Sequence, residues 1–114
     1  MASNFYFARE ARQQASMRRP ILNEIQYIEN GIADAIEAGE LSTEVGPESG
    51  LTEGFTNNED AYDAWSEPTT AVEDKHNVLR FQMNEVISHF TKLGYRITRT
   101  AVEGQKEFNW SIKW

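Results

Sequence analysis

The sequence predicts an α+β fold in which helices cover one face of a small antiparallel sheet. Apolar residues recur every three or four positions over residues 21–36 and again over residues 79–93, as in amphipathic α-helices. After Gly94 the apolar period changes to two, as in half-buried β-strands. A long helix followed by a β-hairpin is therefore expected over residues 74–114.

Two helices are predicted at the N-terminus, over residues 4–19 and 21–38, or a single helix kinked at Pro20. Proline lacks an N–H group and clashes with the preceding turn, so a kink or a break is expected there. Small side chains repeat at helical steps along the first helix: Ala8, Ala11 and Ala15. They suit a helix that lies close to another surface. Residues 1–20 are expected to form a helical arm, attached to a single α+β domain over residues 21–114.

The middle of the chain predicts a short strand and then a long loop. Apolar and polar residues alternate from Leu41 to Val45, as in a half-buried strand. Residues 46–60 are acidic and interrupted by glycine and proline, so they are expected to form a mobile loop. One helical turn, capped by Asp60, is expected over residues 61–65.

The predicted core joins the isoleucine stripe of the N-terminal part to the long helix and the hairpin. Trp110 lies on the apolar side of the last strand and is expected to face Met83, Val86 and Phe90. The full predicted core is Ile25, Ile28, Ile32, Ile36, Met83, Val86, Ile87, Phe90, Tyr95, Ile97, Phe108, Trp110 and Ile112.

Composition limits what this chain can be. Its 114 residues suit one domain, and they include no cysteine, which excludes disulfides, thiolate metal sites and thiol nucleophiles. No apolar run reaches the roughly 20 residues that span a bilayer, and no secretory signal is recognisable, so synthesis in the cytoplasm is expected. The sequence contains no phosphate-binding loop and no nucleophile elbow. We therefore expect neither an enzyme nor a cofactor.

The possible ligand sets for a metal ion are incomplete. His76 and His89 fall on different faces of the predicted long helix, and Glu85 shares a face with His89 but finds no third ligand. Oxygen ligands cluster at residues 57–60 and Asp63, but their spacing differs from that of an EF-hand loop. No metal site is assigned, and whether the loop binds a cation stays open.

Charge is distributed in blocks along the chain. The formal net charge is −7, yet residues 1–19 carry four arginines against one glutamate, and residues 37–74 carry eleven acidic residues and no basic one. One interpretation is a solvated acidic loop. The other is a subunit whose acidic middle meets the basic ends of a neighbouring copy. Nucleic acid is not an expected partner, because the pI is about 4.8 and Arg96 and Arg99 fall on opposite faces of one strand.

Assembly contacts are predicted at both ends of the chain. Three adjacent aromatics precede the arginines of the N-terminal helix, and a single small core is not expected to bury all three. The last strand ends at Trp114 and is expected to leave a free edge for another chain. The predicted contacts are Phe5, Tyr6, Phe7, Arg9, Arg12, Arg18, Arg19 and Trp114. Contacts between unlike patches repeat around an axis, so a homo-oligomeric ring is expected.

Several core segments resemble a module found in tailed bacteriophages. The segments are Gln82–Ile87 with Phe90, Leu93–Ile97, and Phe108–Trp114. Small virion proteins of marine and cyanobacterial phages share this pattern, with an isoleucine-rich helix upstream and an aromatic pair before the long helix, here Tyr62 and Trp65. The resemblance covers most of residues 21–114. It rests on core residues, so it implies no catalytic assignment.

The resemblance implies a structural component of a phage virion, made in the cytoplasm of an infected bacterium and assembling with its own copies and other virion proteins. A neck or tail (head–tail) connector and a capsid-surface subunit both fit. The chain departs from the family in loop 46–60 and in the N-terminal helix, so the particle component, copy number, symmetry and host stay open. The alternative is a small cytosolic phage protein that binds and inhibits a host protein.

Overall fold

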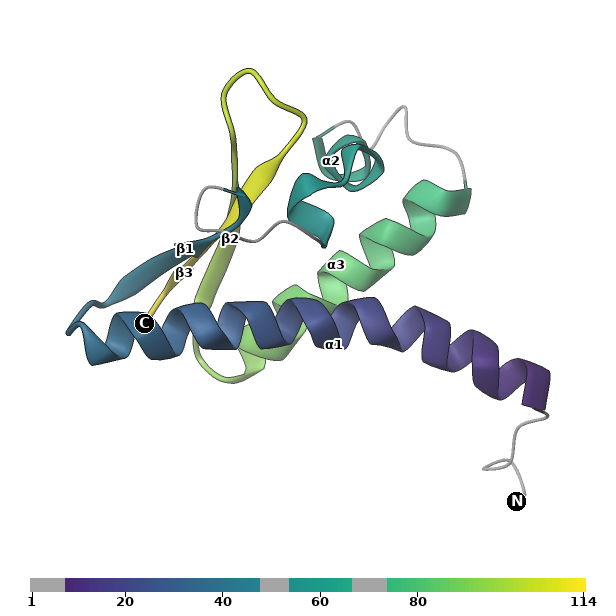
Figure 1. Cartoon of the computed structure of the whole chain (residues 1–114), viewed down its shortest axis with the longest axis horizontal. Coiled ribbons are helices and arrows are strands. Elements are labelled where there is room, and N and C mark those ends of the chain that lie inside the picture. The colour runs from purple at the N-terminus through teal and green to yellow at the C-terminus, as the bar shows by residue number, and fades with distance from the viewer. Residues whose placement is uncertain (1–7, 48–53, 67–73) are drawn as a thin grey trace.

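One helix, α1 (Ala8–Glu37), makes up the N-terminal third of the chain (Figure 1). The structure is a computed structural model that describes residues 8–47, 54–66 and 74–114. Pro20 lies inside α1, so the chain forms one helix through this position and the two-helix alternative is wrong. The C-terminus of α1 is closed by Gly39, whose φ of 79° favours glycine. The N–H of Gly39 donates to the carbonyl of Ile36 at 2.9 Å.

The sheet has three antiparallel strands in the order β1–β3–β2. The strand after α1 is β1 (Ser42–Val45), and the C-terminal hairpin consists of β2 (Arg96–Ala101) and β3 (Phe108–Lys113). Ile112 on β3 pairs with Thr43 on one side and with Ile97 on the other. The predicted free edge on the closing strand is therefore wrong, because β3 is the central strand and its hydrogen bonds are used on both sides.

The long helix of the C-terminal part is α3 (Asp74–Lys92), which packs against α1, α2 and β2 (Figure 1). Its buried stripe ends at Phe90, since Leu93 is 63% exposed. Gly94 follows with a φ of 95°, in the left-handed region that favours glycine. Among the described residues, no helix combines the length and the apolar character needed to cross a membrane.

Part of the predicted acidic loop 46–60 is regular structure. Residues Phe55–Asn57 form a short 3-10 helix, η2, and residues Glu59–Ser66 form an α-helix, α2 (Figure 1). The predictions of a loop up to residue 60 and of a single turn after it are therefore wrong over this stretch. Residues 48–53 of the same loop lie outside the described residues.

Two contacts explain why this stretch is ordered. Phe55 is 3% exposed, so an apolar side chain inside an otherwise acidic segment anchors it to the core. Asn58 caps α2, since its side-chain oxygen accepts hydrogen bonds from the N–H groups of Asp60 and Ala61 at 2.9 and 3.2 Å. Asp60, the predicted cap, instead lies inside the first turn.

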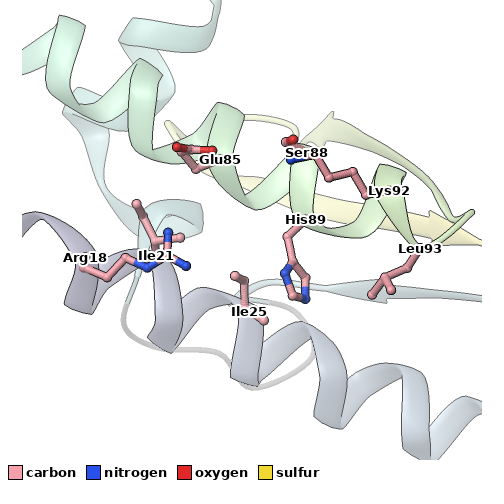
Figure 2. Close-up of a pocket in the computed structure, with 8 residues that line it drawn as sticks. All are labelled: Arg18, Ile21, Ile25, Glu85, Ser88, His89, Lys92 and Leu93. Atoms are coloured by element: carbon pink, nitrogen blue, oxygen red, sulfur yellow. The ribbon is translucent and has the colours of Figure 1, made fainter.

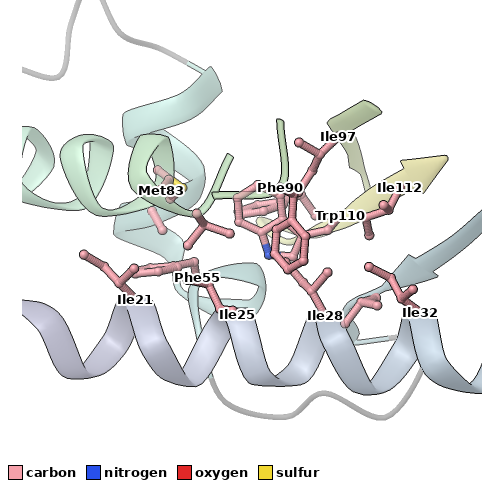
Figure 3. Packing of buried hydrophobic residues seen from close by; sticks show 14 of the residues in the cluster. Ile21, Ile25, Ile28, Ile32, Phe55, Met83, Phe90, Ile97, Trp110 and Ile112 are labelled. Carbon is pink, nitrogen blue, oxygen red and sulfur yellow. The ribbon is translucent and has the colours of Figure 1, made fainter. Parts of the chain in front are cut away.

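One hydrophobic core joins α1, α3 and the sheet, and Figure 3 shows Trp110 between the two helices. Burial confirms the predicted core positions Ile25, Ile28, Ile32, Met83, Val86, Phe90, Ile97, Phe108, Trp110 and Ile112. Ile87 and Tyr95 are partly buried at its margin. Ile36 was wrongly predicted, because it is 57% exposed. Ala35 takes the buried position, since it lies seven residues after Ile28, which is nearly two helical turns.

Candidate functional site

The predicted assembly contacts lie at two separate places in the fold. The basic ones, Arg9, Arg12, Arg18 and Arg19, are all exposed on the N-terminal half of α1. Trp114 lies at the far end of the sheet, where its ring packs edge-on against Tyr95 with centroids 6.0 Å apart. The three predicted aromatic contacts lie outside the described residues: Phe5, Tyr6 and Phe7. The structure therefore does not bring the basic contacts and Trp114 together.

The first turns of α1 make little contact with the rest of the described chain. All nine residues from Ala8 to Ser16 are exposed, and this end of the helix projects past the body in Figure 1. Packing begins at Met17, whose carbonyl accepts a hydrogen bond of 2.9 Å from the side chain of Gln82. The cause is visible in the sequence, because the isoleucine stripe begins at Ile21. A helical segment without tertiary packing gains stability when a partner covers it.

The exposed aliphatic residues of α1 gather on one face of the helix. They are Ala8, Ala11, Ala15, Leu22, Ala33 and Ile36, and we call this set the outer stripe. At about 100° per residue they fall within roughly 80° of arc, centred about 120° from Ile28, so the stripe borders the buried face of α1 rather than lying opposite it. Leu22 at the middle is 50% exposed. Sequence reasoning noticed the alanines but missed the continuation, because it assigned Ile36 to the core.

The exposed charges of α1 are also separated along its length. Residues 8–20 carry four arginines and one glutamate, whereas residues 21–37 carry four acidic residues and no basic one. Of those four, Glu24 is buried and the other three are exposed. Within the described part of the chain, no ion pair engages Arg12, Arg18, Glu29 or Glu37. The outward face of α1 is therefore basic at one end and acidic at the other.

Glu24 is a carboxyl group in the interior, only 1% exposed. It accepts hydrogen bonds from Nε1 of Trp110 at 2.8 Å and from the N–H of Phe55 at 3.4 Å. Burial raises the pKa of Glu24 to about 7, and the two hydrogen bonds partly oppose this rise. Sequence reasoning did not single out Glu24, although its position on the isoleucine face was the available signal.

A cavity of about 350 Å³ lies beside Glu24, bounded by α1, η2 and α3. Its polar lining comes from Arg19, Asn23, Tyr27, Asn58 and Gln82. The described lining residues include neither a second carboxylate nor a nucleophile that could work with Glu24. We therefore assign Glu24 a structural role, because its hydrogen bonds join α1, η2 and β3.

A groove of about 310 Å³ separates α1 from the C-terminal half of α3 (Figure 2). Arg18 borders it from α1, and Glu85, His89 and Lys92 border it from α3. Glu85 and His89 share a face as predicted, but the described structure shows no hydrogen bond between them. The ring of His89 packs edge-on against Phe90, with centroids 4.9 Å apart. The residues that line this groove include no third ligand for a metal ion.

Three possible cation ligands converge where α2 meets α3. The ligand atoms of Asp60, Asp63 and His76 all lie within 4.8 Å of one another. Lys75 lies 3.5 Å from the carboxylate of Asp60, and Lys106 lies 3.5 Å from that of Asp63. The two ammonium groups balance the two carboxylates, so we interpret the group as an ion-pair network that joins α2 to α3 and to the hairpin turn.

Arg99 is partly buried against α2 and the sheet. Its guanidinium carbon lies 5.4 Å from the ring centroid of Trp65 and 5.8 Å from that of Trp110, within the range of cation–π attraction. Burial lowers the pKa of Arg99. The side chain therefore belongs to the packing that holds α2 against the sheet.

These polar groups are explained by contacts within the fold, whereas the outer stripe and the exposed arginines of α1 have no such contacts in the described part of the chain. The outward face of α1 is therefore the candidate functional site. Comparison of the chain with models of protein families, with curated proteins and with solved structures found no match.

Proposed function

We propose that this chain is a structural component of a bacteriophage virion, which acts by assembling with its own copies and with other virion proteins. The observation that carries the proposal is the exposed N-terminal end of α1, residues 8–16, which projects from the body with arginines and small apolar residues on its surface. The resemblance of the core segments to small virion proteins of tailed phages supports a location in the phage particle. A neck or tail connector and a capsid-surface subunit are the candidate positions.

The composition of the projecting segment is that of a contact surface. Residues 8–19 contain four arginines and no lysine, and arginine is enriched at protein interfaces where lysine is depleted. The guanidinium group presents a rigid fork of donors that matches a carboxylate. An acidic protein surface is therefore the chemistry that this segment fits best.

Charge alone is not enough to hold such a contact. Exposed ion pairs contribute about 0–1 kcal/mol each, so apolar side chains must supply most of the adhesion. Along α1 that apolar surface is the outer stripe, which runs beside the arginines. Both kinds of contact are thus present on one face of one helix.

A truncated chain that lacks residues 1–16 tests the proposal. Residues 8–16 are exposed and the contact with Gln82 begins at Met17, so the truncated chain is expected to keep its fold by circular dichroism and thermal melting. In washed particles of the encoding phage, mass spectrometry is expected to recover the full chain at a fixed stoichiometry. The truncated chain is expected to be absent from them.

Arg96→Glu is a matched control, since it changes an exposed arginine on the sheet edge rather than on α1. Normal incorporation of this variant is expected. Incorporation of the truncated chain at the full-length level would remove α1 as the contact surface. Absence of the full-length chain from washed particles would contradict the virion proposal and favour the cytosolic inhibitor of a host protein.

A further inference from the structure

We propose that the partner of α1 is α1 of a second copy of this chain, packed antiparallel along the outer stripe, with Leu22 facing its own counterpart across a two-fold axis. The inference rests on the proposed function, because it names the contact through which the subunit assembles. It follows from three properties of α1: the spacing of its exposed stripe, the order of its charges and the access to its outward face.

The spacing of the exposed stripe is symmetric about Leu22. Counted outward from Leu22, the aliphatic residues of the outer stripe lie 11 and 14 residues away in both directions, and the exposed positions 4 and 7 residues away complete the face. They are Arg18, Ala15, Ala11 and Ala8 toward the N-terminus, and Gln26, Glu29, Ala33 and Ile36 toward the C-terminus. Two antiparallel copies therefore place Leu22 against Leu22. The same register places Ala11 against Ala33, and Ala8 against Ile36.

The side-chain sizes in this register are complementary. Alanine against alanine lets two helix backbones approach closely, and the large Ile36 meets the small Ala8 rather than another large residue. Packed helices have axes about 8–10 Å apart, depending on the side chains at the contact, and small residues favour the shorter distances. In a parallel pair, by contrast, Ile36 would meet Ile36 and the alanines would meet alanines, leaving an uneven gap along the seam.

The charges favour the same direction. In the antiparallel register Arg18, which also borders the groove against α3, faces Gln26 of the second copy and lies about one turn from its Glu29. Arg12 lies on the same side as Glu37 of the second copy. Each pair occurs twice because of the two-fold symmetry. A parallel pair would instead bring each arginine beside itself and each glutamate beside itself, and such like-charge contacts are unfavourable. The pairs set the direction of the contact more than its strength.

The outward face of α1 is accessible over its whole length. Leu22 lies about 100° around the helix from the core residue Ile21 and about 120° from Ile28, so the outer stripe borders the buried face, and each of its residues is exposed. At 1.5 Å per residue the 30-residue helix is about 45 Å long, so the contact extends over most of the molecule. An isologous contact of this kind closes on itself, so the assembly unit is a dimer and any ring needs a second contact surface.

Disulfide trapping in the purified full-length chain tests the register, because the natural sequence contains no cysteine. Leu22→Cys places two thiols across the axis and is expected to form a reducible covalent dimer under mild oxidation. Asn23→Cys is the matched control, because Asn23 is exposed at the same level of α1 but points about 100° away. No dimer from Leu22→Cys, or equal dimer from both variants, overturns the inference.

A second pair of variants tests the direction. Ala11→Cys and Ala33→Cys are each expected to stay monomeric on oxidation, and their equimolar mixture is expected to give a covalent heterodimer. A covalent dimer from Ala11→Cys alone would show a parallel pair and overturn the inference.

Charge reversal provides a test that needs no cross-link. Arg18→Glu and Glu29→Arg are each expected to weaken self-association by roughly tenfold in sedimentation or light scattering, because each replaces attraction by repulsion twice per dimer. The double variant, and an equimolar mixture of the two single variants, are expected to recover the association of the natural chain. Failure of both to recover it overturns the inference.

The tests of the antiparallel pair can fail independently of the tests of the proposed virion function. If Leu22→Cys gives no dimer while loss of residues 1–16 still blocks incorporation, the virion proposal stands and α1 binds a different particle protein. That result overturns the antiparallel pair alone. If the pair forms in solution but the chain is absent from particles, the virion proposal fails and the pair stands.

Discussion

Replacing Glu24 by glutamine should change how stability depends on pH. The folded protein holds the Glu24 proton up to a pKa of about 7, whereas the usual value is 4.5. The folded state therefore binds more protons between these values, and the free energy of unfolding falls as pH rises through this window. Each tenfold change in acidity is worth about 1.4 kcal/mol, so the loss attributable to Glu24 approaches about 3 kcal/mol above pH 7. Below about pH 4.5 Glu24 is protonated in both the folded and the unfolded state, so this loss of unfolding free energy is absent.

Glutamine is neutral at every pH, so the Glu24→Gln variant should lack this loss. Its side-chain oxygen can still accept the hydrogen bond from Nε1 of Trp110, but its NH₂ group then faces the N–H of Phe55, which costs about 1 kcal/mol. We expect the variant to be slightly less stable than the natural protein at pH 5 and more stable by about 2 kcal/mol at pH 8.

Urea unfolding followed by tryptophan fluorescence at several pH values between 5 and 8 measures this difference. Histidines contribute equally to both proteins, so their effect cancels when the two curves are subtracted. Glu29→Gln on the exposed side of the same helix is the matched control, and it should keep the pH dependence of the natural protein. Parallel curves for the natural protein and Glu24→Gln would refute the reasoning, because they would show that the carboxyl group is not buried in the folded state.

Three further substitutions test the fold. Trp110→Ala should lower the free energy of unfolding by about 3–5 kcal/mol, because it empties the centre of the core and removes the donor to Glu24; an unchanged melting temperature would contradict the assigned face of β3. Gly46→Ala should lower the free energy of unfolding by about 1–3 kcal/mol, since a Cβ atom there would lie 2.9 Å from the carbonyl oxygen of Phe108. A rise in stability would show that the backbone at Gly46 is not packed closely against Phe108. Asn58→Ala should lower the free energy of unfolding by about 1 kcal/mol because it removes the cap of α2, whereas Asn58→Asp should keep most of the stability, since its carboxylate can accept the same hydrogen bonds. Equal melting temperatures for the natural protein and these two variants would exclude the cap.

Periodicity in the sequence determined which elements form. The α+β class, the long helix over residues 74–92 and the C-terminal hairpin were predicted from apolar spacing and are present in the structure. Most core positions were also predictable, because a buried face imposes its own period on the chain. The same reasoning identified small residues on the first helix, which are now part of the outer stripe.

Tertiary structure decided the features that depend on residues distant in the sequence. Strand order belongs to this class, since local pattern cannot tell that β3 inserts between β1 and β2. Phe55 is another case, because its burial depends on a pocket formed by other elements, and one apolar residue in an acidic segment carries no period. Ile36 shows the reverse, because it continues the isoleucine stripe near the end of α1 but the core ends at Ala35, which leaves Ile36 exposed.

Glu24 shows most clearly why the sequence alone was insufficient. A glutamate within an isoleucine stripe looks like a polar interruption, and its protonation depends on how completely the other elements exclude water. The donor from Trp110 comes from a residue 86 positions later in the chain. The sequence by itself determined the helices, the strands and most of the buried faces, because these follow from local geometry. The environment of Glu24 and the exposed outer face of α1 were decided by the way those elements pack.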